Sequence, residues 1–271
     1  MDGLDQLLAQ AAQPGWGWMS PAVYRRLHAS ARDCPGGLIV EIGTYRGAAT
    51  VALALGAQES GRGVRVLTAD ILRPGVGLEG ASVEARVGEL QATLERFGVA
   101  EGVSFVHGTA RELVAAHDPR AITLLLLDGG GKIEADFALL WERMAPGCLV
   151  VIDDVDGAVH VERGPSGAVV DQKHRISKLL ADAFVEAGLL RPVAMLGSTG
   201  WYGKGPAEAG PGTFERLALP CYHQLIKCAV PAGELGLGRA LMLGAARKVP
   251  GLAGIVRRMR GLRQAPPQPL P

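Results

Sequence analysis

Short apolar segments alternate with amphipathic segments from residue 38 onward, and this alternation constrains the fold more than any other feature of the sequence. Strands that are apolar on both faces and alternate with helices form a parallel sheet covered by helices on both sides. The predicted strands are Leu38–Ile42, Arg65–Ala69, Val103–His107, Ile122–Leu127 and Leu149–Ile152, and the predicted helices are Ala48–Leu55, Ser82–Phe97, Ala110–Ala116 and Glu134–Met144.

The segment after the fifth strand completes the predicted sheet. Gly157 to Val170 is rich in glycine and is expected to be a loop, and Asp171 to Ala187 has helical spacing. Pro192–Leu196 and Thr199–Tyr202 are expected to pair as closing strands. The chain therefore predicts an α/β fold, a Rossmann-like, doubly wound sheet of seven strands, mostly parallel, with a C-terminal helical extension.

Three segments are expected along the chain. Residues 1–36 form an N-terminal helical segment, 37–205 the sheet domain, and 206–271 a basic helical extension. The extension has predicted helices at Glu215–Cys228 and Leu235–Arg247, breaks at Pro220, Pro231 and Pro250, and a Pro-rich end expected to be disordered. The N-terminal segment carries Trp16, Trp18 and Met19 before a predicted helix at Pro21–Ala31, and either covers a pocket or packs on the sheet edge.

Composition excludes several protein classes. The chain is 48% hydrophobic and 20% charged, enough for a substantial core, yet no apolar run approaches the roughly 18 residues of a membrane span. The acidic N-terminus lacks a secretory signal, so we expect a cytoplasmic protein. The four cysteines form no CxxC pair, which favours reduced thiols over zinc ligands or disulfides.

Basic residues concentrate near the C-terminus, although the net charge is only +1. Basic amphipathic helices bind anionic membranes, acidic proteins or RNA, but a lid or subunit contact with a solvated basic face is the simpler interpretation. The remainder is acidic and poor in aromatic residues, which argues against a nucleic-acid substrate. The helices at either end are candidates for contacts between copies of the chain.

The first predicted strand ends in a glycine-containing turn, VEIGTYRGAAT at residues 40–50, which runs directly into a helix. Glycines let a backbone turn sharply, and open α/β sheets bind ligands beyond the carboxyl ends of their strands. The spacing is GxxxG rather than the GxGxxG of dinucleotide-binding loops, and Asp70 lies further along than the acidic residue of that motif. A nicotinamide-dependent oxidoreductase is therefore disfavoured.

Five landmarks at strand ends together resemble the class I S-adenosylmethionine-dependent methyltransferases, and among them the small-molecule O-methyltransferase branch with VEIGxxxGxST and DGDHSYE motifs. The landmarks are the turn at 40–50, Asp70, HGTA at 107–110, DGGGKIE at 128–134 and the pair Asp153-Asp154. The resemblance covers roughly residues 20–205, and the landmarks stand in the order that this family shows.

The resemblance implies a binding site for S-adenosylmethionine. Gly43 and Gly47 would approach the methionine part, Glu41 would support its amino end, and Asp70 would accept hydrogen bonds from the ribose hydroxyls. An N-cap or a loop ion pair is the alternative role for Asp70. The implied cofactor-binding set also includes Thr109 and Ala110, which would flank the adenine, and Thr44, Tyr45, Thr50, Asp128 and Gly129.

Three carboxylates follow the fourth and fifth predicted strands, which would be neighbours. Asp128, Asp153 and Asp154 would repel one another unless a cation joined them, and Mg²⁺ prefers such oxygen ligands. The same branch includes metal-dependent enzymes with carboxylates at these places, so Mg²⁺ is the expected ion. Alternatively Asp153 contacts cofactor or acceptor without a metal, and Asp154 caps a turn.

The chain departs from the family pattern where a histidine base is expected. Gly130 and Gly131 replace Asp-His, and Ile133 replaces Tyr. Lys132 and His174 are the candidate catalytic residues that remain, and His160 is a further histidine on the same overhanging segment. Each of these side chains is also compatible with a plain surface position.

These patterns predict methyl transfer from S-adenosylmethionine to a hydroxyl of a small molecule, such as a sugar or polyketide-like metabolite, with Mg²⁺ assisting. The missing histidine leaves open transfer to nitrogen or carbon. The alternatives are a metal-independent methyltransferase of the same fold and a noncatalytic protein that binds the cofactor or a partner.

Overall fold

The computed structural model describes residues 3–13, 15–72, 82–130, 132–164 and 167–226. Residues 1–225 form one compact unit. The predicted helix at 235–247, Cys228 and the Pro-rich end lie outside the described residues. The division of the chain at residues 36 and 205 stays a prediction.

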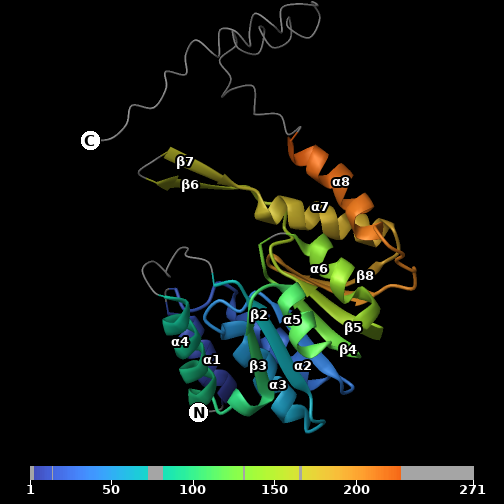
Figure 1. The fold of residues 1–271 in the computed structure, drawn as a ribbon. Helices are drawn as coiled ribbons and strands as arrows, with labels where there is room; N and C mark the ends of the chain where they lie inside the picture. Colours follow the sequence, from blue (N-terminus) through green and yellow to red (C-terminus); the bar gives the residue numbers. More distant parts are fainter. Residues whose placement is uncertain (1–2, 14, 73–81, 131, 165–166, 227–271) are drawn as a thin grey trace, which may run out of the picture. The chain divides into compact units, whose positions relative to one another are not determined.

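Seven strands form one sheet in the order β3-β2-β1-β4-β5-β9-β8. Neighbouring strands are parallel from β3 to β5, whereas β9 runs antiparallel to both β5 and β8 (Figure 1). The predicted Rossmann-like sheet is thus confirmed, including its pair of closing strands. The strands are β1 (Leu38–Ile42), β2 (Arg65–Asp70), β3 (Val103–His107), β4 (Ile122–Leu127), β5 (Met144–Ile152), β8 (Leu190–Leu196) and β9 (Thr199–Lys204).

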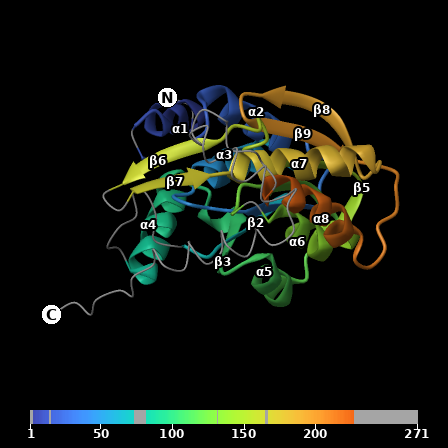
Figure 2. The same ribbon diagram turned by 90° about the horizontal axis from the view of Figure 1, so that it is seen from above.

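Helices cover both faces of this sheet, and each face has its own core (Figure 2). The helices α1 (Gly3–Ala11), α2 (Pro21–Arg32), α3 (Ala48–Ser60) and α4 (Val83–Arg96) bury residues in one core. Those of the other core are α5 (Ala110–His117), α6 (Ile133–Leu140), α7 (Lys173–Glu186) and α8 (Thr213–Ile226). Short 3-10 turns lie at η1 (Ala100–Gly102) and η2 (Trp141–Arg143).

Local signals explain where several helices begin. The Ser20 hydroxyl accepts a hydrogen bond from the Val23 amide at the start of α2, ahead of Pro21 at its first position. Thr109 and Glu112 form a capping box at α5. The helix α1 was not predicted from the sequence. The helix predicted at 134–144 ends at Leu140 and is followed by η2, because β5 begins at Met144.

A two-stranded hairpin replaces the loop predicted at Gly157–Val170. It consists of β6 (His160–Gly164) and β7 (Gly167–Asp171), paired antiparallel with His160 opposite Asp171. The loop prediction was wrong because the glycines at 164 and 167 close the turn of a hairpin rather than mark an irregular segment. Figure 1 shows the hairpin projecting beyond the carboxyl ends of the strands, next to the start of α7.

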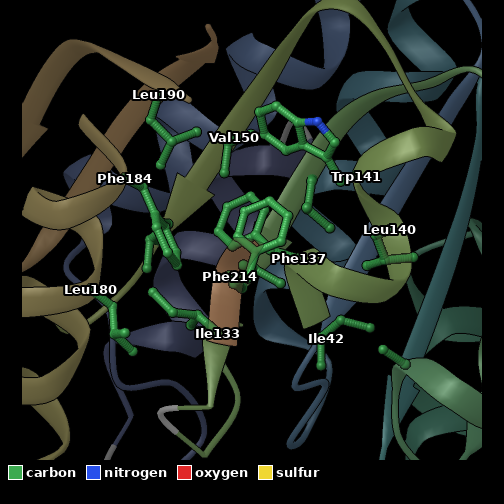
Figure 3. Close-up of a cluster of buried hydrophobic side chains, with 14 of the residues drawn as sticks. Ile42, Ile133, Phe137, Leu140, Trp141, Val150, Leu180, Phe184, Leu190 and Phe214 are labelled. Atoms are coloured by element: carbon green, nitrogen blue, oxygen red, sulfur yellow. The ribbon is translucent and has the colours of Figure 1, made fainter. Parts of the chain in front are cut away.

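Four aromatic side chains join α6, η2, α7 and α8 in one core (Figure 3). The ring of Phe214 stacks on Phe137 at 5.5 Å between centroids, and Phe184 meets both rings edge-on at 5.3 and 5.2 Å. Trp141 lies 5.4 Å from Phe214. Aromatic pairs in these arrangements stabilise a core beyond their apolar area. The packing fastens α8 to the sheet domain.

The predicted break at Pro220 does not occur, because α8 runs through it from Thr213 to Ile226. A proline inside a helix removes one backbone hydrogen bond. Buried Phe214 and Ala218 before it, and Cys221 after it, hold both halves of α8 against the core. Tertiary packing therefore outweighs the local cost of the proline.

Two composition-based expectations can be compared with the described residues. Their cysteines, Cys34, Cys148 and Cys221, are buried and free of disulfides, as predicted. Among the helices described here, none has the length and apolar character that crossing a membrane requires.

Phe214→Ala is expected to destabilise the chain by about 3–5 kcal/mol, because it opens a cavity at the centre of the aromatic core. Urea unfolding followed by circular dichroism measures the difference. Leu219→Ala on the same helix is the matched control, since Leu219 is 58% exposed and its truncation should change stability by less than about 0.5 kcal/mol. Equal losses for both variants would contradict the packing of α8 described above.

Candidate active site

The turn after β1 passes close to the backbone at the end of β4. Gly43 has a φ of +102°, and a β-carbon there would collide with the backbone carbonyl of Asp128. Gly47 has a φ of +87° and precedes the first residue of α3. Both positions therefore require a positive φ, which glycine adopts at little steric cost. The turn and the end of β4 form the two sides of the candidate site.

Asp70, at the end of β2, holds this turn in place. Its Oδ2 atom accepts hydrogen bonds from the amides of Thr44 at 2.8 Å and Tyr45 at 2.7 Å, and its Oδ1 atom accepts one from the Leu72 amide at 2.6 Å. Tyr45 itself has a φ of +50°. Asp70 was expected at this edge of the sheet, but these backbone contacts were not; they match neither an N-cap nor an ion pair.

Glu41 lies beneath the turn, fully buried. Its Oε2 atom accepts hydrogen bonds from the hydroxyls of Thr50 and Thr68, both at 2.6 Å, and Thr68 also contacts the Thr44 hydroxyl. Its Oε1 atom has no hydrogen-bond partner among the described residues. Burial raises the pKa of Glu41 to about 7. Thr68, which the sequence analysis missed, joins the carboxyl to the turn.

The start of α5 lies next to Asp70 at the same sheet edge. The Gly108 amide donates to the Asp70 carbonyl at 2.9 Å. The Thr109 hydroxyl and Glu112 complete the cap of α5, and Ala110 is buried. The predicted adenine-flanking residues are thus beside the predicted ribose-binding residue. Gly129, on the other side of the turn, lies against Ile42.

The three predicted metal-ligating carboxylates do come together. Asp128, Asp153 and Asp154 each place one oxygen within 4.8 Å of the others. The ends of β4 and β5 position them, since the Asp153 amide donates to the Leu127 carbonyl. Thr199, on β9, donates its hydroxyl to Asp153 Oδ1 at 2.6 Å. Burial is the largest cause that raises the pKa of Asp128 to about 8; Lys173 lowers this pKa, and the neighbouring Asp153 and Asp154 contribute to the rise.

Lys173, at the start of α7, reaches into these carboxylates. Its Nζ atom lies 2.7 Å from Asp154 Oδ2 and 3.3 Å from Asp128 Oδ1. Although burial disfavours its charged form, these carboxylates raise the pKa of Lys173 above its ordinary value. Lys173 was not predicted as a site residue, because no spacing rule connects the start of α7 with the end of β4.

The two predicted catalytic side chains lie in different surroundings. His174 contacts the cluster, with Nε2 2.9 Å from Asp154 Oδ1 and Nδ1 2.8 Å from Asp156 Oδ1. The ring of His160, on the hairpin, meets the His174 ring edge-on at 4.4 Å. Lys132 is exposed at the N-cap of α6. The structure therefore brings His174, and not Lys132, into direct contact with the carboxylates.

The two tryptophans of the N-terminal segment lie in different surroundings. Trp16 is buried and packs near Phe97, 6.2 Å between ring centroids. Trp18 is 67% exposed with its ring 6.2 Å from that of Tyr45, whose hydroxyl donates to the Gly15 carbonyl at 3.1 Å. One tryptophan thus stabilises the core, while the other adds an exposed apolar surface beside the turn.

Residues 40–155 match a family model described as a methyltransferase domain. The matched region spans β1 to the residues just after β5, and so contains the turn, Asp70 and the carboxylate cluster. No curated protein matches the chain in sequence.

Solved structures of methyltransferases share the fold at low sequence identity. The S-adenosylhomocysteine-bound methyltransferase PaMTH1 from Podospora anserina has a TM-score of 0.56 at 14% identity, over 76% of this chain and 89% of that one. The O-methyltransferase TomG from Streptomyces achromogenes, involved in tomaymycin synthesis and bound to S-adenosylmethionine, scores 0.51 at 17% identity, over 76% and 91%. An O-methyltransferase from Bacillus cereus with S-adenosylhomocysteine scores 0.52 at 18% identity, over 75% and 91%.

Glu41→Gln should remove a pH dependence of stability. The pKa of Glu41 is higher in the folded chain, about 7, than its ordinary value of 4.5, so folding favours the protonated form. That contribution is complete below about pH 4.5 and is lost as pH rises through 7. Wild type should therefore lose up to about 3 kcal/mol relative to Glu41→Gln between about pH 5 and pH 8.5.

Urea unfolding at the two pH values measures this difference. Glu89→Gln, at an exposed position on α4, serves as the control and should follow wild type at both. Parallel pH profiles for wild type and Glu41→Gln would contradict the buried, protonated carboxyl.

Proposed function

We propose that the chain transfers a methyl group from S-adenosylmethionine to a hydroxyl of a small-molecule acceptor, such as a sugar or a polyketide-like metabolite of natural product biosynthesis. The observation that carries the proposal is the turn held by Asp70 directly beside a cluster of acidic and basic side chains. A cofactor on the turn would point its methyl group toward groups that can orient an acceptor. The structural likeness to proteins bound to S-adenosylmethionine or S-adenosylhomocysteine supports this choice.

The cofactor would lie along the turn and the end of β2. Gly43 and Gly47 provide the positive φ values that shape the turn, the methionine part would lie along this backbone, and Asp70 would face the ribose. Each carboxylate oxygen can accept more than one hydrogen bond, so Asp70 can bind hydroxyls while it holds the amides of Thr44 and Tyr45. The proposed cofactor-binding set is Glu41, Gly43, Thr44, Tyr45, Gly47, Thr50, Asp70, Thr109, Ala110, Asp128 and Gly129.

Within that set, Glu41 and Thr50 would support the turn from beneath rather than contact the cofactor. Both side chains are buried under the turn and hydrogen-bonded to each other, with Thr68 as the third member. They support the position of the turn by fixing the first residues of α3. A rigid turn matters because displacement of bound substrates by about 1 Å can cost roughly a hundredfold in rate.

The reaction is a direct displacement. The acceptor oxygen forms a bond to the methyl carbon, the bond from that carbon to the sulfonium sulfur breaks, and S-adenosylhomocysteine leaves with the electron pair. His174, the proposed catalytic residue, donates its Nδ1–H to Asp156, and its Nε2 atom receives the proton of the acceptor hydroxyl by way of Asp154. Lys132, exposed on α6, is the weaker candidate.

Two of the carboxylates expected to bind Mg²⁺ already contact basic side chains. Carboxylate oxygens are suitable ligands, and Asp128, Asp153 and Asp154 are correctly grouped for one ion. Lys173, however, already places a positive charge on Asp128 and Asp154, and His174 binds the other oxygen of Asp154. A divalent ion on the same oxygens would repel the ammonium group. The described arrangement therefore does not fit Mg²⁺, and no step proposed here requires it.

Wild type should bind S-adenosylhomocysteine, and Asp70→Ala should weaken this binding at least tenfold, since it removes the ribose acceptor and both contacts to the turn. Calorimetric titration measures the affinities. Asp182→Ala, which loses only a surface ion pair with Lys178, is the control and should bind like wild type. Absence of binding to wild type would refute the proposed function, and unchanged affinity for Asp70→Ala would refute the role of Asp70.

His174→Asn should lower the rate of methyl transfer by about a hundredfold, which is the lower end of the rate effect of a general acid or base, without weakening cofactor binding. Turnover is measured as product formation over a panel of hydroxylated sugars and polyketides. Lys132→Met and His117→Asn, both at exposed positions, should keep the wild-type rate. A large loss in Lys132→Met instead would transfer the catalytic role to Lys132. Cofactor binding without turnover on any acceptor would favour the noncatalytic alternative.

A further inference from the structure

Three carboxylates lie together in this site. Asp128, Asp153 and Asp154 hold one oxygen each within 4.8 Å of the others, and Asp153 is buried. Like charges at this distance repel, and burial increases the repulsion because less solvent screens it. A nearby cation, a proton held by one of the carboxyls, or both must relieve this repulsion.

We propose that the ammonium group of Lys173 is the resident cation of this site, in place of a metal ion. Its Nζ atom bridges Asp128 at the end of β4 and Asp154 at the end of β5. The lysine thus occupies the bridging position between two strands that a divalent ion would take. The inference deepens the proposed function and rests on it for what the site is used for.

The other contacts of the cluster engage further carboxylate oxygens. Both oxygens of Asp154 are engaged, Oδ2 by Lys173 and Oδ1 by His174. Asp153 Oδ1 accepts from the hydroxyls of Thr199 at 2.6 Å and Ser198 at 3.4 Å. Mg²⁺ demands nearly octahedral coordination by oxygen at about 2.1 Å, so an ion on Asp128 Oδ1 and Asp154 Oδ2 would require the ammonium group of Lys173 to move away.

The start of α7 provides an independent observation. Its first residues are Lys173, His174 and Arg175, and its first turn contains no acidic residue. The positive end of a helix dipole lies at its N-terminus, so basic residues there are ordinarily unfavourable. Two of these three side chains point into the carboxylate cluster. The unusual sequence of the helix start is explained if the carboxylates compensate it.

The Lys173 side chain is also held in its place. Its backbone amide donates to Asp171 Oδ1 at 2.8 Å, which anchors the helix start to the end of β7. Its side chain is 26% exposed, whereas Lys178, further along the same helix, is 45% exposed and pairs with Asp182 on the surface. Lys178 is therefore a matched control of the same type and on the same element.

A fixed ammonium group suits the proposed reaction. An ammonium has three N–H donors, and two of them serve Asp154 and Asp128. The third can donate to the acceptor oxygen and so position it against the methyl group. Lys173 would then do the work of orientation that a metal ion performs elsewhere.

Titration with Mn²⁺, as a probe for Mg²⁺, tests the inference by calorimetry without any acceptor. Wild type and Lys178→Ala should show no binding at millimolar Mn²⁺. Lys173→Ala leaves the carboxylates without their cation, so it should bind Mn²⁺ at least tenfold more tightly than wild type. Lys173→Arg keeps the charge and should resemble wild type.

Stoichiometric Mn²⁺ binding to wild type would overturn the inference. A folded Lys173→Ala variant that does not gain Mn²⁺ binding would overturn it as well. Circular dichroism checks that each variant is folded. If Lys173→Ala does not fold, the Mn²⁺ titrations of wild type and Lys173→Arg still test the inference. S-adenosylhomocysteine binding is measured on the same samples. Its absence in wild type would refute the proposed function, whereas the Mn²⁺ result would separately uphold or overturn the charge assignment.

Discussion

The close approach of β1 and β4 at Gly43 is the constraint on which the rest of the site depends. The sheet order reverses between these two strands, and ligands of open α/β folds bind at such a switch point. Only a glycine permits the backbone of the turn to pass the Asp128 carbonyl at this distance. The turn pinned by Asp70 lies on one side of the contact, and the carboxylates after β4 and β5 lie on the other.

Ion pairs connect the carboxylates after β4 and β5 to elements far along the chain. The end of β4, the end of β5 and the start of α7 each contribute charge to one cluster, and His174 extends it to His160 on the hairpin. Because a buried charge is stable only with a partner, removing one member alters the environment of all the others. The hairpin, the helix start and the strand ends therefore depend on one another.

Much of the fold could be predicted, because its signals are local. Seven strands follow from runs of apolar residues, and the seven-stranded order agrees with the expected doubly wound sheet. The errors occurred where packing overrides local preference. Pro220 lies inside α8 because aromatic contacts hold both halves of that helix, and the hairpin at 160–171 resembled a glycine-rich loop.

The sequence by itself determined which residues stand at the carboxyl ends of the strands, and so placed Asp70, Asp128, Asp153 and Asp154 at one edge of the sheet. Strand ends follow from periodicity, and a parallel sheet collects them at the same edge. Only the tertiary structure decided what those carboxylates contact. Lys173 is 45 residues away from Asp128 in sequence, and its approach depends on how α7 packs, which no local pattern encodes.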